Sequence, residues 1–205
     1  MSSELFSQQA YEQLKHRIIT CELEPGGYYT EAGLAADLQL GKTPTREALM
    51  RLAREDWVQS VKGRGYRVQS LSLAGIRELF GARLVLEPAA VFEAAGRLTP
   101  DEVRQLRQIC GTTFDLTEPE ERLEYLQANH AIHMGIVAGC RNKLLNDMVR
   151  QLLERSQRLL YIGMVVTEWN QVAARHHEEI VDAVAGGEAL LARTLITEHI
   201  AAAEK

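Results

Sequence analysis

The stretch Thr30–Arg54, TEAGLAADLQLGKTPTREALMRLAR, reads as two short helices joined by a tight turn. Thr30 can cap the first helix, and Glu31 in its first turn suits the positive end of the helix dipole. Leu40 in the turn is apolar and able to tuck inside, and Gly41 is expected to bend the chain. Three apolar residues share one face of the first helix at helical spacing: Leu34, Ala35 and Leu38.

The second helix of this pair has one apolar face and one basic face. We expect Thr43 to cap it and Pro44 to take its first helical position. In a helix-turn-helix, the N-terminal residues of the second helix meet base edges in the major groove, and Arg46 lies in that part. Two short amphipathic helices also occur in other helical proteins, so the flanking sequence decides. The apolar face comprises Thr45, Ala48, Leu49 and Leu52, and the opposite face carries Arg46, Met50, Arg51 and Arg54.

The sequence on either side extends this pair to a winged helix. A helix is predicted over residues 6–19, and two β-prone runs, 57–61 and 66–69, follow the pair. The runs flank the tip Lys62-Gly63-Arg64-Gly65, which is typical of a hairpin. A glycine-rich tip can lie close to a phosphate backbone or a minor groove, and Arg64 supplies the charge.

Charge favours a nucleic-acid partner only in one part of the chain. The formal net charge of −5 argues against such a partner, but residues 37–67 hold seven basic and four acidic residues. The three cysteines are far apart, which favours reduced thiols over a disulfide framework. The N-terminal residues do not resemble a signal peptide, and no apolar run reaches the roughly 18 residues of a membrane span. We therefore expect a cytoplasmic protein.

The second part of the chain is predicted to be an all-α bundle. We place the boundary at Ser70-Leu71-Ser72, which gives a DNA-binding domain of residues 1–70 and a helical domain of residues 71–205. The predicted fold class is mostly α, a winged helix-turn-helix followed by a six-helix bundle. Capping boxes, T-x-x-E, are predicted from Thr99 and from Thr117. The six helices are expected at residues 73–96, 100–115, 118–138, 142–163, 168–185 and 188–204.

Two charged residues interrupt the apolar stripe of the first bundle helix. Arg83 and Glu87 are one turn apart among apolar residues such as Phe80 and Ala90. They predict either a partly buried ion pair that holds two helices together or, for Arg83, a contact with the carboxylate of a bound ligand. The spacing leaves both interpretations open.

Histidines interrupt the stripes of three other helices. The third bundle helix offers His130 or His133, the fifth offers His176 or His177, and the last offers His199. One histidine on an apolar face is usually a satisfied core residue, but three from facing helices can form a metal site with an added oxygen ligand. Neutral imidazoles suit zinc, nickel, iron or manganese. Spacing does not choose between the neighbouring histidines.

Three motifs stand out in residues 6–69: Leu23-x-Pro25-Gly26, Thr43-Pro44-Thr45-Arg46-Glu47-Ala48-Leu49 and Gly63-x-Gly65-Tyr66-x-Val68. They closely resemble the winged-helix domain of GntR-family bacterial transcription regulators. The remainder resembles the FCD ligand domain in its shorter, six-helix, VanR-like form. The resemblance implies a homodimer that reads a short palindrome in double-stranded DNA. It also implies DNA contacts from Glu31, Lys42, Thr43, Arg46 and Arg51, and from Arg64 and Gly65 in the wing.

The same resemblance selects among the histidines. Asn129-x-x-Ile132-His133 stands where the family usually has Asp-x-x-Phe-His, and His177-x-x-Ile180-x-x-Ala183 and His199 match the other histidines of the family. This implies a divalent metal ion, such as zinc, nickel or manganese, held by Asn129, His133, His177 and His199. The asparagine removes one negative charge from the usual ligand set. A small organic acid would bind beside the metal, and we expect Arg83 to contact its carboxylate.

The sequence leaves three functions open. The first is a repressor whose operator affinity falls when a small carboxylate binds at the metal and Arg83. The second is a DNA-binding protein whose bundle only dimerises, with inert buried histidines. The third is a metalloenzyme, but the histidines lack an H-E-x-x-H arrangement, so we predict that the protein is not an enzyme. An acyl-CoA sensor fits poorly, because polar histidines would occupy the cavity that such a ligand needs.

Overall fold

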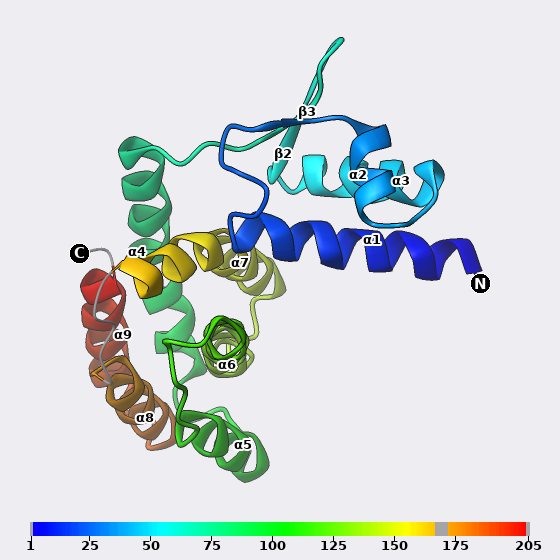
Figure 1. Cartoon of the computed structure of the whole chain (residues 1–205). Helices are drawn as coiled ribbons and strands as arrows, with labels where there is room; N and C mark the ends of the chain where they lie inside the picture. The colour runs from blue at the N-terminus through cyan, green and yellow to red at the C-terminus, as the bar shows by residue number, and fades with distance from the viewer. Residues whose placement is uncertain (1, 167–171, 204–205) are drawn as a thin grey trace. The chain divides into compact units, whose positions relative to one another are not determined.

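The computed structural model describes residues 2–166 and 172–203, and the chain divides into two compact units, Met1–Ser72 and Leu73–Lys205 (Figure 1). The described ranges contain nine helices and three strands, which confirms the mostly α fold class. None of the described helices combines the length and the apolar character that crossing a membrane requires.

Unit 1, residues 1–72, is a winged helix. Its strands form one antiparallel sheet in the order β1-β3-β2, with Val58 opposite Val68 and Tyr29 opposite Tyr66. The sequence does not predict β1, because two residues are too few to show an alternating pattern. In chain order the elements are α1 (Ser2–Ile19), β1 (Tyr28–Tyr29), α2 (Glu31–Asp37), α3 (Lys42–Arg54), β2 (Val58–Val61) and β3 (Gly65–Val68) (Figure 1).

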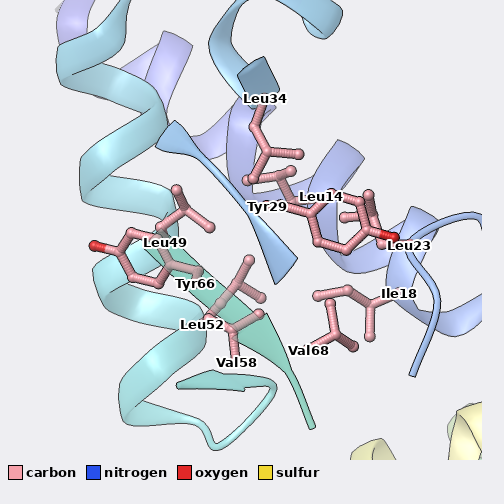
Figure 2. Close-up of a pocket in the computed structure, with 10 residues that line it drawn as sticks. All are labelled: Leu14, Ile18, Leu23, Tyr29, Leu34, Leu49, Leu52, Val58, Tyr66 and Val68. Atoms are coloured by element: carbon pink, nitrogen blue, oxygen red, sulfur yellow. The ribbon is translucent and has the colours of Figure 1, made fainter. Parts of the chain in front are cut away.

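Apolar side chains from all three helices and the sheet fill the core of unit 1 (Figure 2). Leu14 and Ile18 of α1 and Leu49 and Leu52 of α3 are inaccessible to solvent or nearly so. The space left among the side chains labelled in Figure 2 has a volume of about 10 Å³ and an apolar lining. Such a space is no larger than one water molecule. The side chains labelled in Figure 2 therefore pack closely and leave no space for a ligand among them.

The turn between α2 and α3 differs from the prediction. α2 ends in a Schellman pattern, in which the Leu40 N–H donates to the Ala35 carbonyl at 3.1 Å. This pattern needs a left-handed residue, which is Gln39 with φ 55°, whereas Gly41 has φ −67°. Gly41 is instead the N-cap of α3, so the predictions that Gly41 bends the turn and that Thr43 caps the helix are wrong.

Unit 2, residues 73–205, is a helical bundle, and all six predicted helices are found. α4 packs against α9 and α7, and α8 packs against α9 and α5 (Figure 1). The largest difference is at α5, which ends at Cys110 and not at residue 115. The predicted start of the fifth bundle helix, at residue 168, lies outside the described residues. The helices are α4 (Leu73–Ala94), α5 (Pro100–Cys110), α6 (Pro119–Val137), α7 (Lys143–Val166), α8 (Val172–Ala185) and α9 (Ala189–Ala203).

One of the two predicted capping boxes is present. At the start of α5, the Thr99 N–H donates to the Glu102 carboxylate at 2.7 Å and the Thr99 hydroxyl accepts from the Glu102 N–H. At α6 the prediction is wrong, because the N-cap is Glu118 and makes no side-chain cap. The Thr117 hydroxyl donates to the Asp115 carboxylate at 2.6 Å, which is a local turn that competes with capping.

Candidate DNA-contacting surface and candidate metal centre

The start of α3 exposes three of the residues predicted to contact DNA: Lys42, Thr43 and Arg46. They face the solvent because the opposite side of the helix is buried in the core of unit 1. The N-terminal end of a helix carries a partial positive charge, to which the two cationic side chains add. This part of α3 therefore suits a polyanionic partner. The buried side of α3 comprises Thr45, Ala48, Leu49 and Leu52, as the apolar face predicts.

Glu31, the first residue of α2, holds the guanidinium of Arg46. Arg46 Nε lies 3.0 Å from Oε2 and 3.2 Å from Oε1 of Glu31, and Nη2 donates to Oε1 at 2.9 Å. The carboxylate thus occupies one edge of the guanidinium. The Arg46 side chain is still 61% exposed, whereas that of Glu31 is 23% exposed. Sequence analysis predicts both residues at the DNA-contacting surface, but it does not predict that they pair.

Arg51, which is predicted to lie near the DNA, makes contacts within unit 1, and its side chain stays 44% exposed. Its guanidinium carbon lies 3.6 Å from the centre of the Tyr11 ring of α1. Its Nε donates to Glu55 at 3.1 Å and its Nη1 donates to Gln8 at 2.9 Å. These contacts join α1 to α3, so Arg51 has a structural role in this conformation.

The tip of the wing places Arg64 against Tyr28. The guanidinium carbon of Arg64 lies 3.9 Å from the centre of the Tyr28 ring, a cation–π distance. Gly65 has φ +92°, and a Cβ atom there would lie 2.4 Å from the Tyr29 carbonyl oxygen. Position 65 therefore requires glycine for the fold of the wing. Sequence analysis missed Tyr28, whose only signal is an aromatic residue next to a glycine-rich turn.

Three histidines converge inside unit 2, one each from α6, α8 and α9. His133, His177 and His199 each offer one ring nitrogen, these three atoms lie within 4.8 Å of one another, and the three side chains are buried. The neighbouring His130 and His176 are less buried, so the structure selects the same histidines as the family resemblance. Asn129 is also buried, one turn before His133 on α6.

The protonation of the cluster suits a metal ion. Burial, with the neighbouring His133 and His176, lowers the pKa of His177 to about 3. Burial also holds the pKa of His199 well below its usual value. Both rings are therefore neutral near pH 7, with a nitrogen lone pair available. Nε2 of His133 and Nε2 of His177 are buried with no hydrogen-bond partner. This lowers the stability of the fold unless a bound ligand interacts with the two nitrogens.

Glu87 connects the histidine cluster to Arg83. One carboxylate oxygen of Glu87 accepts from Arg83 Nε at 2.6 Å, and the other lies 2.8 Å from His133 Nδ1. Although burial raises the pKa of Glu87, Arg83 and His133 outweigh it and lower that pKa to about 2. The ionised carboxylate favours the proton on Nδ1 of His133 and leaves Nε2 as the free nitrogen. Arg83 and Glu87 thus form an ion pair within α4 that is fully buried, whereas the sequence predicts a partly buried one. Arg83 Nη1 also donates to the Ser156 hydroxyl of α7 at 3.4 Å, which links α4 to a second helix.

Two family models match the chain. Residues 6–68 match the model described as "Bacterial regulatory proteins, gntR family", and residues 78–202 match the FCD domain. The FCD match by itself covers more than half of the chain.

Curated relatives and solved structures align over almost the whole chain. The HTH-type transcriptional repressor GlaR of Escherichia coli (strain K12) is 28% identical over 95% of this chain and 92% of that protein. An uncharacterized HTH-type transcriptional regulator of Streptomyces ambofaciens is 29% identical over 94% of this chain and 80% of that protein. Among solved structures, E. coli McbR/YncC aligns with a TM-score of 0.77 and 21% identity, over 96% of this chain and 94% of that chain. The last comparison shows a shared fold.

Proposed function

Since the chain belongs to the GntR family of bacterial regulatory proteins and carries an FCD domain, we propose that it is a repressor that binds a palindromic operator as a homodimer. We further propose that a small organic acid, bound beside a divalent metal ion in unit 2, controls this binding. The family and the relatives are transcription regulators and not enzymes.

The exposed start of α3 carries the proposal of DNA binding. Lys42 and Arg46 present two cations at the N-terminus of the second helix of a helix-turn-helix, which is the part that meets base edges. Arg64 adds a third cation at the wing. Arg46, near the start of α3, can bond bidentately to guanine.

An apolar stripe on α4 supports the homodimer. Val85 is 69% exposed and Phe92 is 41% exposed, and Gly81 and Ala89 are exposed on the same side of the helix at helical spacing. A contiguous exposed apolar surface marks an interaction site. A second copy of the same stripe would cover it with two-fold symmetry, and a palindromic operator has the same symmetry.

The histidine cluster supports the metal and the effector. His133, His177 and His199 would hold zinc, nickel or manganese, with Asn129 as the proposed oxygen ligand. A bound metal supplies a positively charged coordination position for a carboxylate. Arg83 would contact that carboxylate only while sharing its guanidinium with Glu87 and Ser156.

The test uses the full chain purified without a histidine tag. Elemental analysis should find about one divalent ion per chain, and the ion should be lost in a His133→Ala/His177→Ala variant. Binding to palindromic DNA should depend on sequence and should weaken when metal and a matching small carboxylate are added together. Metal-free protein that binds the same palindromes without any response to carboxylates would support a bundle that only dimerises. Binding that ignores DNA sequence would overturn the proposed function.

A further inference from the structure

We propose that Glu31 sets the base specificity of this protein by positioning Arg46, without contacting DNA itself. The inference rests on the proposed DNA-binding function and adds a role that the sequence comparison does not assign. It rests on one observation: the carboxylate of Glu31 in α2 accepts hydrogen bonds from the guanidinium of Arg46 in α3. Arg46 is the residue of α3 that is best placed to read a base.

The geometry of the pair leaves one edge of the guanidinium available. Glu31 accepts from Nε and from Nη2 of Arg46, so it covers the Nε–Nη2 edge. A guanidinium has five N–H donors in a planar fork, and the Nη1–Nη2 edge keeps its outward hydrogens. That edge can donate to N7 and O6 of one guanine, which is the bidentate contact that distinguishes guanine from the other bases. Glu31 thereby leaves the Nη1–Nη2 edge of Arg46 to contact a base.

The position of Glu31 is itself fixed by the start of α2. The Thr30 hydroxyl caps the helix by accepting from the Gly33 N–H at 3.1 Å, which sets the first helical turn. Glu31 is the first residue of that turn, and its side chain is less exposed than that of Arg46. The carboxylate therefore approaches Arg46 from a defined backbone position, which a flexible loop would not provide.

The charge of the pair has a second consequence. Non-specific binding depends on cations that neutralise phosphates, and a carboxylate near DNA opposes it. Because Glu31 compensates the charge of Arg46, the pair adds little to the attraction for phosphates, and Lys42 and Arg64 are left to supply it. Glu31 should therefore lower the affinity for random DNA while raising the discrimination at one base pair of each half-site. These opposite effects distinguish positioning from a simple contact.

The experiment compares the parent with Glu31→Gln and with the control Glu47→Gln. Glu47 is an exposed acid next to Arg46 in the chain, so the control removes the same charge while leaving the pair intact. Competition binding is measured with the operator, with operators substituted at each symmetric pair of positions, and with random DNA. A third variant, Arg46→Ala, is measured with and without Glu31→Gln. Thermal unfolding of each variant shows that it is folded.

In Glu31→Gln we expect the preference for guanine at one pair of positions to fall by about tenfold and the affinity for random DNA to rise. The control should raise the affinity for random DNA and keep the preference. In the Arg46→Ala background, Glu31→Gln should no longer change the preference. An unchanged preference in Glu31→Gln, or an equal loss of affinity for all sequences, would overturn the positioning role. A parent that shows no preference at all would instead overturn the proposed function.

Discussion

Two arginine–carboxylate pairs, one in each unit, use the same chemistry in opposite surroundings. The side chains of Arg46 and Glu31 are 61% and 23% exposed, whereas those of Arg83 and Glu87 are 2% and 1% exposed. The shortest nitrogen–oxygen distances are 2.9 and 2.6 Å. Both arginines are predicted to bind an anionic partner, DNA for Arg46 and an effector for Arg83. Because one pair is exposed and the other is buried, separating the two partners costs much more free energy in the buried pair.

The exposed pair can take a further partner with little loss of free energy, and the buried pair cannot. In water, a carboxylate and a guanidinium attract each other weakly and can take other partners with little loss. In the interior, removal of one partner leaves an uncompensated charge out of contact with water. Arg46 therefore suits a reversible contact with a base. Arg83 suits a permanent contact that keeps Glu87 ionised beside His133.

The largest expected effect comes from breaking the buried pair. Glu87→Ala should lower the free energy of unfolding of unit 2 by about 3–5 kcal/mol, because the Arg83 guanidinium stays buried without the carboxylate that compensates its charge. Equilibrium urea unfolding measures this. Glu78→Ala, at an exposed glutamate of the same helix, should stay within about 0.5 kcal/mol of the parent.

Replacing both partners separates the charge from the packing. An Arg83→Met/Glu87→Leu variant removes both charges of this pair, so it should recover most of the stability that Glu87→Ala loses. If Glu87→Ala costs less than about 1 kcal/mol, the guanidinium finds another partner or water, and the contrast between the two pairs fails.

The second largest expected effect is the stabilisation of unit 2 by zinc at the cluster that contains His133, the histidine that Glu87 contacts. Zinc at about a hundred times its dissociation constant should stabilise the protein by about 2.7 kcal/mol, because it binds only the folded cluster. His133→Ala/His177→Ala should abolish this stabilisation, and His16→Ala, an exposed histidine of α1, should keep it. Thermal unfolding with and without zinc measures the effect. Equal stabilisation of the parent and the double variant would place the ion elsewhere.

A third arginine is exposed, like Arg46, but it contacts an aromatic ring and not a carboxylate. Arg64 stacks on Tyr28, a partner that is itself 41% exposed. Tyr28→Leu should weaken operator binding about two- to fivefold, as expected for an exposed cation–π contact, and should leave base preference unchanged. The effect should vanish in an Arg64→Ala background, measured by the same competition binding. A loss that persists without Arg64 would assign Tyr28 a role of its own.

The sequence predicts most of the fold and the buried site, because both depend on helical periodicity. Arg83, Glu87 and His133 are recognisable as polar residues on apolar stripes. That three histidines converge follows from three stripes that face one core. Spacing leaves His130 or His133 and His176 or His177 open, and the family resemblance selects His133 and His177. The sequence does not predict which residues the exposed arginines contact. Arg46 and Glu31 lie on different helices, and no periodic pattern relates them.

The contact between Arg51 and Tyr11 is another that the sequence does not predict. Helical spacing puts it near Arg46, but its stacking on Tyr11 depends on how α1 crosses α3, which no local pattern encodes. The helix ends are a further case. Gln39 takes the left-handed conformation that Gly41 was expected to supply, because the Schellman hydrogen bonds of α2 fix where the helix stops.

The smallest expected effect is on the stability of unit 1 when its exposed pair is broken. In Glu31→Gln, Arg46 loses a charged partner, but its guanidinium is already hydrated and remains so. We therefore expect the urea midpoint of this variant to be indistinguishable from that of the parent, while base preference changes. Glu87→Gln, the matched change in the buried pair, should shift the midpoint clearly in the same experiment. A comparable shift in Glu31→Gln would mean that the fold of unit 1 depends on the pair. The change in base preference could not then be assigned to the positioning of Arg46 alone, because the substitution would also disturb the fold of unit 1.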